Sequence, residues 1–147
     1  MIAECRQNRR DRGATAVEFA LLVPLLLLLV FGIIDFGRAL NAQITITQAA
    51  REGARLASVG QPASAVQART VGAATGLGLA AGNVVVSGGS GAVSGSAQAC
   101  PAGSAAQGLN ATVTVTYTFR FVTPVAALAS FGATLTQTAQ GVMPCEM

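Results

Sequence analysis

Apolar residues run almost without interruption from Ala14 to Ile34, and Glu18 carries the only charge among these 21 residues. As an α-helix the stretch would be about 31 Å long, which is about the thickness of the hydrocarbon core of a bilayer. A helix with apolar side chains on every side needs lipid or a large protein core around it. The rest of the chain is too rich in Gly, Ala and Ser to supply that core. The pattern therefore predicts a transmembrane helix.

Beyond Ile34 the apolar positions recur every three or four residues, which is the period of one helix face. We therefore expect one continuous helix from about Ala14 to Ser58, apolar all round in its first half and amphipathic in its second. Gly60 and Pro62 follow as helix-ending residues. The face predicted to be apolar in the second half consists of Ile33, Phe36, Leu40, Ile44, Thr47, Ala50, Ala54 and Ala57.

Two residues inside this helix depart from the pattern. Pro24 removes one backbone hydrogen bond and is expected to kink the helix, which membrane helices tolerate when their neighbours assist. Gly53 costs about 1 kcal/mol relative to Ala inside a helix. Gly53 marks either close packing against a neighbouring element or nothing, and both interpretations stay open at this point.

Residues 61–147 have the pattern of a small mixed domain. Residues 63–81 are Ala-rich and predict a second, weaker helix, whereas the Gly- and Ser-rich stretch Ser87–Gly108 predicts a long loop. A helical turn is expected at Val125–Phe131. We expect an α+β fold in which a small three-stranded antiparallel sheet packs on the amphipathic half of the long helix. The predicted strands are Asn83–Ser87, Ala111–Val122 and Thr134–Val142.

The basic residues predict the orientation of the transmembrane helix. Four Arg precede the apolar run, and only Arg38, beside Asp35, follows within the next fifteen residues. Arg-rich flanks stay on the cytoplasmic side, so we expect a cytoplasmic N-terminus and an exported C-terminal domain. The net charge of +3 then reflects membrane topology, and no basic stripe indicates binding to nucleic acid. The four preceding residues are Arg6, Arg9, Arg10 and Arg12.

The three cysteines agree with this topology. Cys5 lies on the cytoplasmic side, and Cys100 and Cys145 lie in the exported part, where disulfides persist. A Cys100–Cys145 bond would close a loop of about 45 residues and contribute about 4 kcal/mol in the chain-entropy model. The alternative is a pair of free, unrelated thiols. The sequence has no His, and this argues against a metal site.

The composition also argues against an enzyme. The chain has no His, no Lys and only six acidic residues, so its Ser residues have no base to activate them. Gly76-Leu77-Gly78 lacks the third glycine of a phosphate-binding loop and follows no predicted strand. We expect no catalytic residues and no cofactor.

The residues with distinctive chemistry are at the start of the apolar run. Gly13 follows basic residues, and Glu18 stands five positions later inside a predicted membrane helix. A charge in the centre of a membrane costs about 2.5–3.5 kcal/mol, so Glu18 needs a partner. Cleavage after Gly13 would create one, the α-amino group of Ala14, which a neighbouring chain can present in an assembly. The alternative is an acid that reaches the interface or is protonated, and negative charge near a helix N-terminus is favourable in any case.

At these residues the chain resembles a known family. Gly13 followed by Glu18-Phe19 resembles the processing site of type IV prepilin-like proteins, in which a prepilin peptidase cuts after the glycine. The run from about Arg12 to Ser58 is similar to the TadE-like family of minor pseudopilins of the Tad (Flp, tight adherence) pilus system. Ala14 departs from the general type IV pattern, which has phenylalanine as the first mature residue. The features shared with the TadE-like family include Gly13, Glu18-Phe19, Pro24, Phe36-Gly37 and Ala50–Arg55.

The resemblance implies a pilin-like protein of the bacterial inner membrane with a defined division of the chain. Residues 1–13 would be a leader, 14–34 the transmembrane helix, 35–60 its amphipathic continuation and 61–147 the exported domain. The implied partners are prepilin peptidase, pilin and other pseudopilin subunits, the inner-membrane assembly platform and membrane lipid. Cleavage would remove Cys5 with the leader and leave 134 of the 147 residues (147 − 13).

Two other classes of protein share much of this pattern. A secreted protein with an ordinary signal peptide would have a shorter apolar run and a small-residue cleavage site just beyond it. A single-pass envelope protein that is neither processed nor polymerised would share every feature except cleavage at Gly13. The first mature residue distinguishes the three possibilities.

Overall fold

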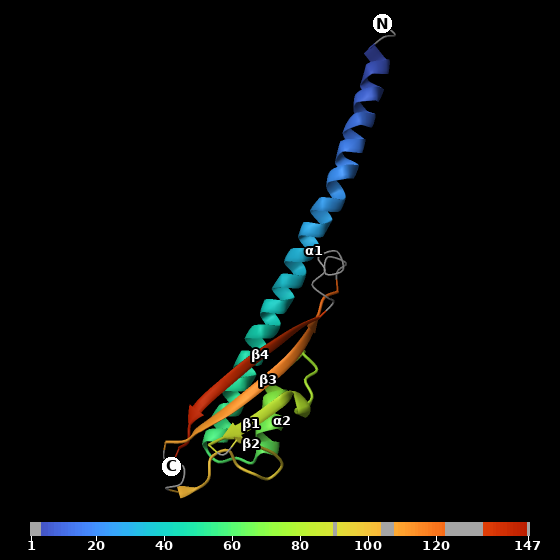
Figure 1. Cartoon of the computed structure of the whole chain (residues 1–147). Helices are drawn as coiled ribbons and strands as arrows, with labels where there is room; N and C mark the ends of the chain where they lie inside the picture. Colours follow the sequence, from blue (N-terminus) through green and yellow to red (C-terminus); the bar gives the residue numbers. More distant parts are fainter. Residues whose placement is uncertain (1–3, 90, 104–107, 123–133, 147) are drawn as a thin grey trace.

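A computed structural model of the chain describes residues 4–89, 91–103, 108–122 and 134–146, with side chains from Gly13 onward. The helical turn predicted at Val125–Phe131 lies outside the described residues. The elements in chain order are the helices α1 (Glu4–Ser58) and α2 (Ala63–Ala73), the short 3-10 helix η1 (Ala81–Asn83), and the strands β1 (Val84–Gly88), β2 (Gly91–Val93), β3 (Asn110–Arg120) and β4 (Thr134–Pro144). Figure 1 shows the N-terminal half of α1 extending far beyond the sheet.

α1 contains the predicted transmembrane and amphipathic segments in one helix of 55 residues. It ends at Ser58, as predicted, because Gly60 adopts a φ of 75°. The amide of Gly60 donates to the carbonyl of Ala57 at 3.1 Å, and the amide of Gln61 donates to that of Leu56 at 3.3 Å. These two bonds form a Schellman cap, which satisfies carbonyls that the helix end would leave unpaired.

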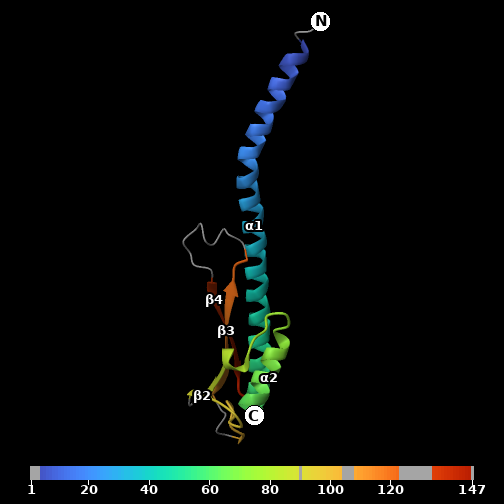
Figure 2. The same cartoon turned by 90° about the vertical axis from the view of Figure 1, so that its right-hand side faces the viewer.

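α1 starts earlier than the sequence predicted, and it is curved rather than straight. The helix begins at Glu4 rather than at Ala14, so the predicted leader continues it. Pro24 lies inside the helix without ending it. Figure 2 shows that α1 is curved along its length. A kink localised at Pro24 stays a prediction.

The strands form one antiparallel sheet in the order β2-β1-β3-β4. β3 and β4 pair over their whole length, from Asn110 opposite Pro144 to Arg120 opposite Thr134, without a bulge. α1 packs against β3 and β4, and α2 packs against α1 and β1. Figure 2 shows both helices on the same side of the sheet, so the domain has two layers.

The α+β class and the antiparallel pairing are confirmed, but the sheet has four strands rather than three. The three predicted strands form as β1, β3 and β4, with ends shifted by at most two residues. The additional strand β2 lies in the stretch Ser87–Gly108, which we predicted to be a loop. Its three residues pair with β1 at Val86–Gly88. A strand this short has no alternating pattern to detect, and its antiparallel pairing with β1 places it in the sheet.

α2 is shorter than the predicted helix at 63–81. It ends at Ala73, and Gly76 and Gly78 follow with φ values of 82° and 62°. These left-handed conformations are available to glycine at low cost and cannot continue a helix. The chain therefore turns back toward β1 at this point.

Small residues form the face of α1 that packs on the sheet, so the apolar face predicted from the sequence was partly wrong. The three alanines of the predicted face are buried, whereas its bulky residues are between 49% and 65% exposed. The buried alanines are Ala50, Ala54 and Ala57, and the exposed residues are Ile33, Phe36, Leu40 and Ile44. The sheet lies too close to the helix for these bulky side chains. The buried apolar residues of α1 are Ala39, Ala42, Ile46, Ala49, Ala50, Ala54 and Ala57.

Two glycines lie where elements approach each other most closely. A Cβ added at Gly53 of α1 would collide with the hydroxyl of Thr70 in α2 and lie 3.2 Å from a methyl group of Val113 in β3. A Cβ added at Gly141 of β4 would collide with the backbone of α1 at Ala50. Gly53 therefore marks close packing, which was one of the two interpretations of the sequence. Gly141 marks the close packing of β4 against α1 in the same way.

A Gly53→Ala variant should be destabilised by about 1–2 kcal/mol, because the overpacking penalty exceeds the gain in helix propensity. Thermal unfolding of the purified full chain in detergent measures this. Gly37→Ala is the matched control on the same helix, since a Cβ there meets nothing within 4 Å. The control should be neutral or slightly stabilising. Equal effects of the two substitutions would contradict the packing that we describe.

Candidate functional site

The residues predicted to act in processing and assembly lie together near the N-terminal end of α1. Gly13, Ala14, Glu18 and Phe19 are all exposed. A side chain at Gly13 would meet nothing within 4 Å, so the described part of the chain leaves the peptide bond after it open to another protein. Ala14 and Glu18 are four residues apart and therefore lie on the same face of the helix, about one turn from each other.

Glu18 is surrounded by apolar residues and has no opposite charge near it within the described part of the chain. The ion pairs formed there join Arg38 to Asp35 and Arg69 to Glu52. The neighbours of Glu18 on the helix include Val17 and Phe19, which are 62% and 68% exposed. The carboxylate is therefore available to a positive group of another chain.

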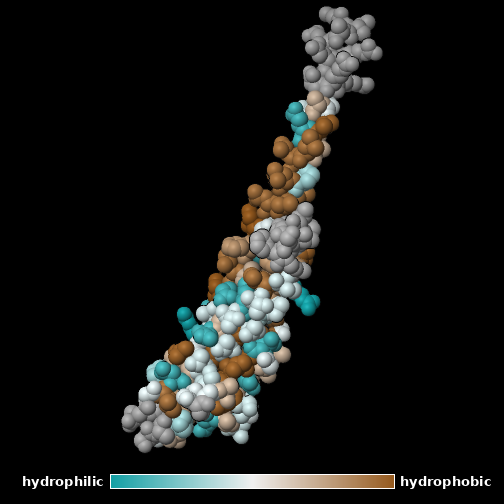
Figure 3. Space-filling view, viewed as in Figure 1, coloured by the Kyte–Doolittle hydropathy of each residue, from teal (hydrophilic) through white to brown (hydrophobic). Residues whose placement is uncertain are grey.

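The first half of α1 has an apolar surface that its own domain leaves uncovered. Among the described residues, α1 is the helix that is long and apolar enough to cross a membrane, with a mean hydropathy of 2.8 over its most apolar window and none of that window buried. Figure 3 shows brown, apolar residues along this part of the molecule, beyond the paler domain. Most of its Val, Leu, Ile and Phe side chains from Val17 to Ile34 are at least 40% exposed. Lipid or other subunits must cover them.

A small cluster joins the end of this apolar segment to the sheet. Asp35 is only 3% exposed, and its Oδ1 accepts a hydrogen bond from Nη1 of Arg38 at 3.2 Å. The Arg38 guanidinium lies 5.4 Å from the ring centroid of Phe119, which stands edge-on to Phe121 at 5.3 Å. Cation–π and edge-to-face contacts of this kind stabilise the packing. The cluster holds the end of β3 against α1 immediately beyond the predicted membrane segment.

Sequence reasoning missed this cluster because it considered Asp35 and Arg38 only as charges that follow the apolar run. The signal that was available is their spacing of three residues, which allows an ion pair within a helix. The aromatic residues at the end of the Ala111–Val122 run are the second half of the signal. Nothing in the sequence alone shows that the Asp35–Arg38 pair and these aromatic residues lie next to each other in the fold.

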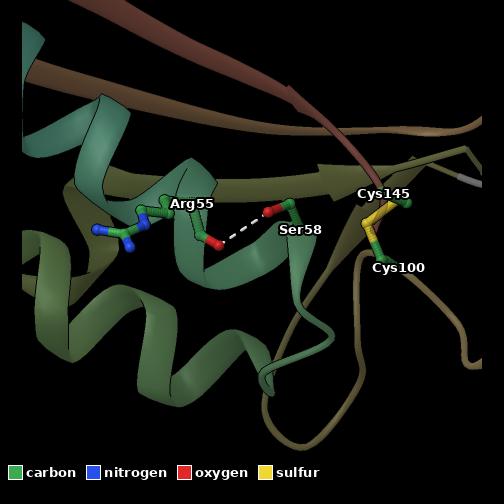
Figure 4. The surroundings of a disulfide bond; sticks show 4 residues. All are labelled: Arg55, Ser58, Cys100 and Cys145. Atoms are coloured by element: carbon green, nitrogen blue, oxygen red, sulfur yellow. Dashed lines mark hydrogen bonds between the residues drawn. A yellow bond between two sulfur atoms is a disulfide. The ribbon is translucent and has the colours of Figure 1, made fainter. Parts of the chain in front are cut away.

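A disulfide joins Cys100 to Cys145 at the opposite end of the domain, with their Cα atoms 5.6 Å apart. Figure 4 shows this bond between the loop that follows β2 and the residue after β4, close to the C-terminal end of α1. The amide of Cys145 donates to the carbonyl of Leu109 at 2.9 Å, and that of Glu146 donates to the carbonyl of Ser58 at 3.0 Å. The predicted pairing is therefore present, and it fixes the C-terminal segment to α1.

A shallow hollow lies between α1 and α2. Gln48 and Glu52 of α1 and Arg69 of α2 border it. Glu52 and Arg69 pair with each other at 2.8 Å, so their charges already satisfy one another. No group of three or more His, Cys, Asp or Glu residues comes together within the described part of the chain. This hollow gives no reason to infer a catalytic site.

Comparison with known families identifies the segment that carries these features. Residues 13–55 match the family model of the TadE-like proteins. This segment is TadE-like. The resemblance expected from the sequence is therefore confirmed over 43 of the 147 residues (55 − 13 + 1). No curated protein and no solved structure matches the chain.

The TadE-like segment begins at Gly13 and ends within the last turn of α1. It therefore includes the predicted cleavage site, Glu18, the candidate membrane span and the small-residue face that packs on the sheet. The sheet itself, α2 and the disulfide lie outside the match. The match thus covers most of α1, and the domain that follows lies beyond it.

A Cys100→Ser variant should migrate on non-reducing gels like the reduced wild type. Its free energy of unfolding should fall by up to about 4 kcal/mol, because the loop between the two cysteines is no longer closed in the unfolded chain. Denaturant titration of the full chain with and without reductant measures this. Cys5→Ser is the control and should change neither readout. Free labelling of the Cys100 and Cys145 thiols in the oxidised wild type would contradict the disulfide.

Proposed function

We propose that the chain is a minor pseudopilin that takes part in assembly of a Tad/Flp-type adhesion pilus. The observation that carries the proposal is the TadE-like segment of α1, which begins at Gly13, has an uncovered apolar half and leads into a small α+β domain. This is the form of a subunit that is held in a membrane first and packed among other helices later. The proposed role is structural, without catalysis, cofactor or nucleic acid.

The proposed orientation places residues 1–13 in the cytoplasm and the sheet domain outside the inner membrane. Two independent features support it. The four Arg before the apolar run favour the cytoplasmic side. The Cys100–Cys145 bond requires an oxidising compartment to persist, which the periplasm or cell surface provides.

In the proposed processing step, prepilin peptidase hydrolyses the peptide bond between Gly13 and Ala14. The exposure of this segment and the lack of a side chain at Gly13 support access by the enzyme. Glycine also weakens the helix locally, by about 1 kcal/mol relative to Ala, which lowers the cost of opening it for cleavage. The product begins with a free α-ammonium group on Ala14.

In the proposed assembly step, the Ala14 ammonium of one subunit pairs with the Glu18 carboxylate of its neighbour. Each charge alone is costly within lipid, and the pair removes most of that cost if its hydrogen bonds are satisfied. Other pilin-like subunits and the inner-membrane assembly platform are the proposed partners in this step. The bare apolar surface from Val17 to Ile34 supports packing among such helices.

N-terminal sequencing of the protein extracted from membranes tests the processing step. Ala14 should be the first residue. Met1 as the first residue would indicate the alternative, a single-pass envelope protein that is not processed. A first residue beyond about position 35 would indicate a secreted protein. A Gly13→Val variant should remain uncut, since the added side chain occupies the position that the enzyme requires to be bare.

A Glu18→Ala variant should insert into membranes as efficiently as the wild type but lower the number of assembled pili at least about tenfold, because the unpaired ammonium of the neighbour stays in lipid. Membrane fractionation and pilus counting measure the two properties. Glu52→Ala is the control, since it removes an acid of the same helix in the exported part. Normal pilus numbers in the Glu18 variant would refute the assembly step.

A further inference from the structure

β4 is an edge strand of 11 residues, and within the described part of the chain only a side chain of α1, Gln43, bonds to the backbone groups that face away from β3. The direction of these groups follows from the register. The amide of Cys145 donates to the carbonyl of Leu109, so this pair is hydrogen-bonded, and hydrogen-bonded pairs alternate along an antiparallel ladder. The residues bonded to β3 are therefore Leu135, Gln137, Ala139, Gly141 and Met143.

The alternate residues of β4 point their amides and carbonyls away from β3. One contact confirms this direction, since Nε2 of Gln43 in α1 donates to the carbonyl of Thr138 at a long 3.4 Å. The side chains of the same residues lie on the sheet face opposite the helices. These outward residues are Thr134, Thr136, Thr138, Gln140 and Val142.

Among the described residues, β4 lacks most of the features by which proteins protect an edge strand, and Gln43 of α1 is the one side chain that bonds to its outer backbone groups. Protected edges are short, bulged, charged or interrupted by proline. β4 pairs with β3 through 11 consecutive residues without a bulge, contains no charged residue, and has its proline at the last position. The opposite edge of the sheet is the three-residue strand β2, which is protected by its shortness. The difference between the two edges indicates that β4 receives a partner.

We propose that the open edge of β4 binds an extended segment of a different exported subunit, which continues the sheet as an antiparallel strand. Main-chain hydrogen bonds would supply the affinity, as in other cases of strand addition. Fully extended, β4 offers a row of backbone donors and acceptors about 37 Å long. This inference rests on the proposed function for its partner, a further subunit of the same assembly, and on α1 lying in a membrane; it does not depend on cleavage at Gly13.

The direction of β4 relative to α1 excludes pairing of β4 with its own copy through a twofold axis. α1 and β4 run the same way, since Gln137 donates to the carbonyl of Ala39 and Glu146 to that of Ser58. Antiparallel pairing of two β4 strands would turn the second copy upside down. The apolar halves of the two α1 helices would then point in opposite directions and could not enter one membrane.

A second copy of the chain could pair its edge strand β2 with β4, but β2 is too short to cover the whole length of β4. β2 runs antiparallel to β4, because β1 is antiparallel to both β2 and β3. A neighbour with the same orientation can therefore present β2 to β4 correctly. However, β2 has three residues and β4 has 11. The occupant is consequently a longer segment from another subunit, running toward the membrane.

The side chains on the outer face of β4 also indicate what kind of segment would bind there. Thr136, Thr138 and Gln140 offer hydroxyl and amide groups without charge on the outer face of the sheet. β-branched and polar uncharged residues pair favourably with such a strand, whereas a charged strand gains no opposite charge from it. The occupant is expected to be a Thr-, Val- or Ser-rich extended segment without charged residues.

Amide hydrogen exchange resolved to single residues tests the proposal on the full chain. In the isolated protein in detergent, the amides of Gln137, Ala139 and Gly141 should be protected, whereas those of Thr136, Thr138 and Gln140 should exchange quickly. In membranes from cells that also express the other pilus subunits, the second set should slow at least about tenfold. Protection of the second set in the isolated chain would overturn the proposal. So would fast exchange in the membranes that contain the other subunits.

A pair of substitutions at Thr136 separates backbone pairing from side-chain contact. Thr136→Pro removes an amide that points away from β3, a position where edge strands tolerate proline. It should lower the amount of other subunits that co-purifies with the chain about tenfold, and the Cys100–Cys145 bond on non-reducing gels should report an intact domain. Thr136→Val keeps the amide and should co-purify normally. Equal recovery with both variants would overturn the proposal, whether or not pili form.

Discussion

The fold depends on the close approach of one helix to one sheet. α1 touches β3 and β4 through alanines, and Gly53 and Gly141 stand where any side chain would collide. This closeness leaves no room for bulky residues, so the core consists mainly of Ala and Val with Ile46 as its largest fully buried member. A core of small side chains supplies little hydrophobic stabilisation. The disulfide at the far end of the domain compensates for part of this weakness.

The bulky apolar residues that the core excludes remain on the outside of α1. Phe36, Leu40 and Ile44 are exposed and continue the apolar surface of the candidate membrane span into the domain. The same helix therefore offers small residues to its own sheet and large residues to its surroundings. The Asp35–Arg38–Phe119 cluster lies where these two uses meet, and it holds one end of β3 against α1.

The sequence was sufficient for the elements whose signals are local. The end of α1 at Ser58 followed from Gly60, and β3 followed from its alternating Thr, Val and aromatic residues. The packing face of α1 could not be read in this way, because the rule that bulky residues are buried fails where the sheet lies very close. β2 pairs with its neighbour in the chain, β1, but its three residues are too few to give an alternating pattern. The roles of Gly13, Ala14 and Glu18 involve a second chain, so a single chain's structure leaves them as predictions.

Glu18 and the open edge of β4 share one property, since both lack a partner within the described chain. They lie about 38 Å apart along α1, which is the rise of the 25 residues from Glu18 to Gln43 beside Thr138. Under the two proposals, each is satisfied by a neighbour that has the same orientation in the membrane. A closed antiparallel dimer satisfies neither. Contacts between unlike surfaces of similarly oriented subunits generate open, head-to-tail assemblies rather than closed pairs. Under the two proposals, such an assembly would grow outward from the membrane.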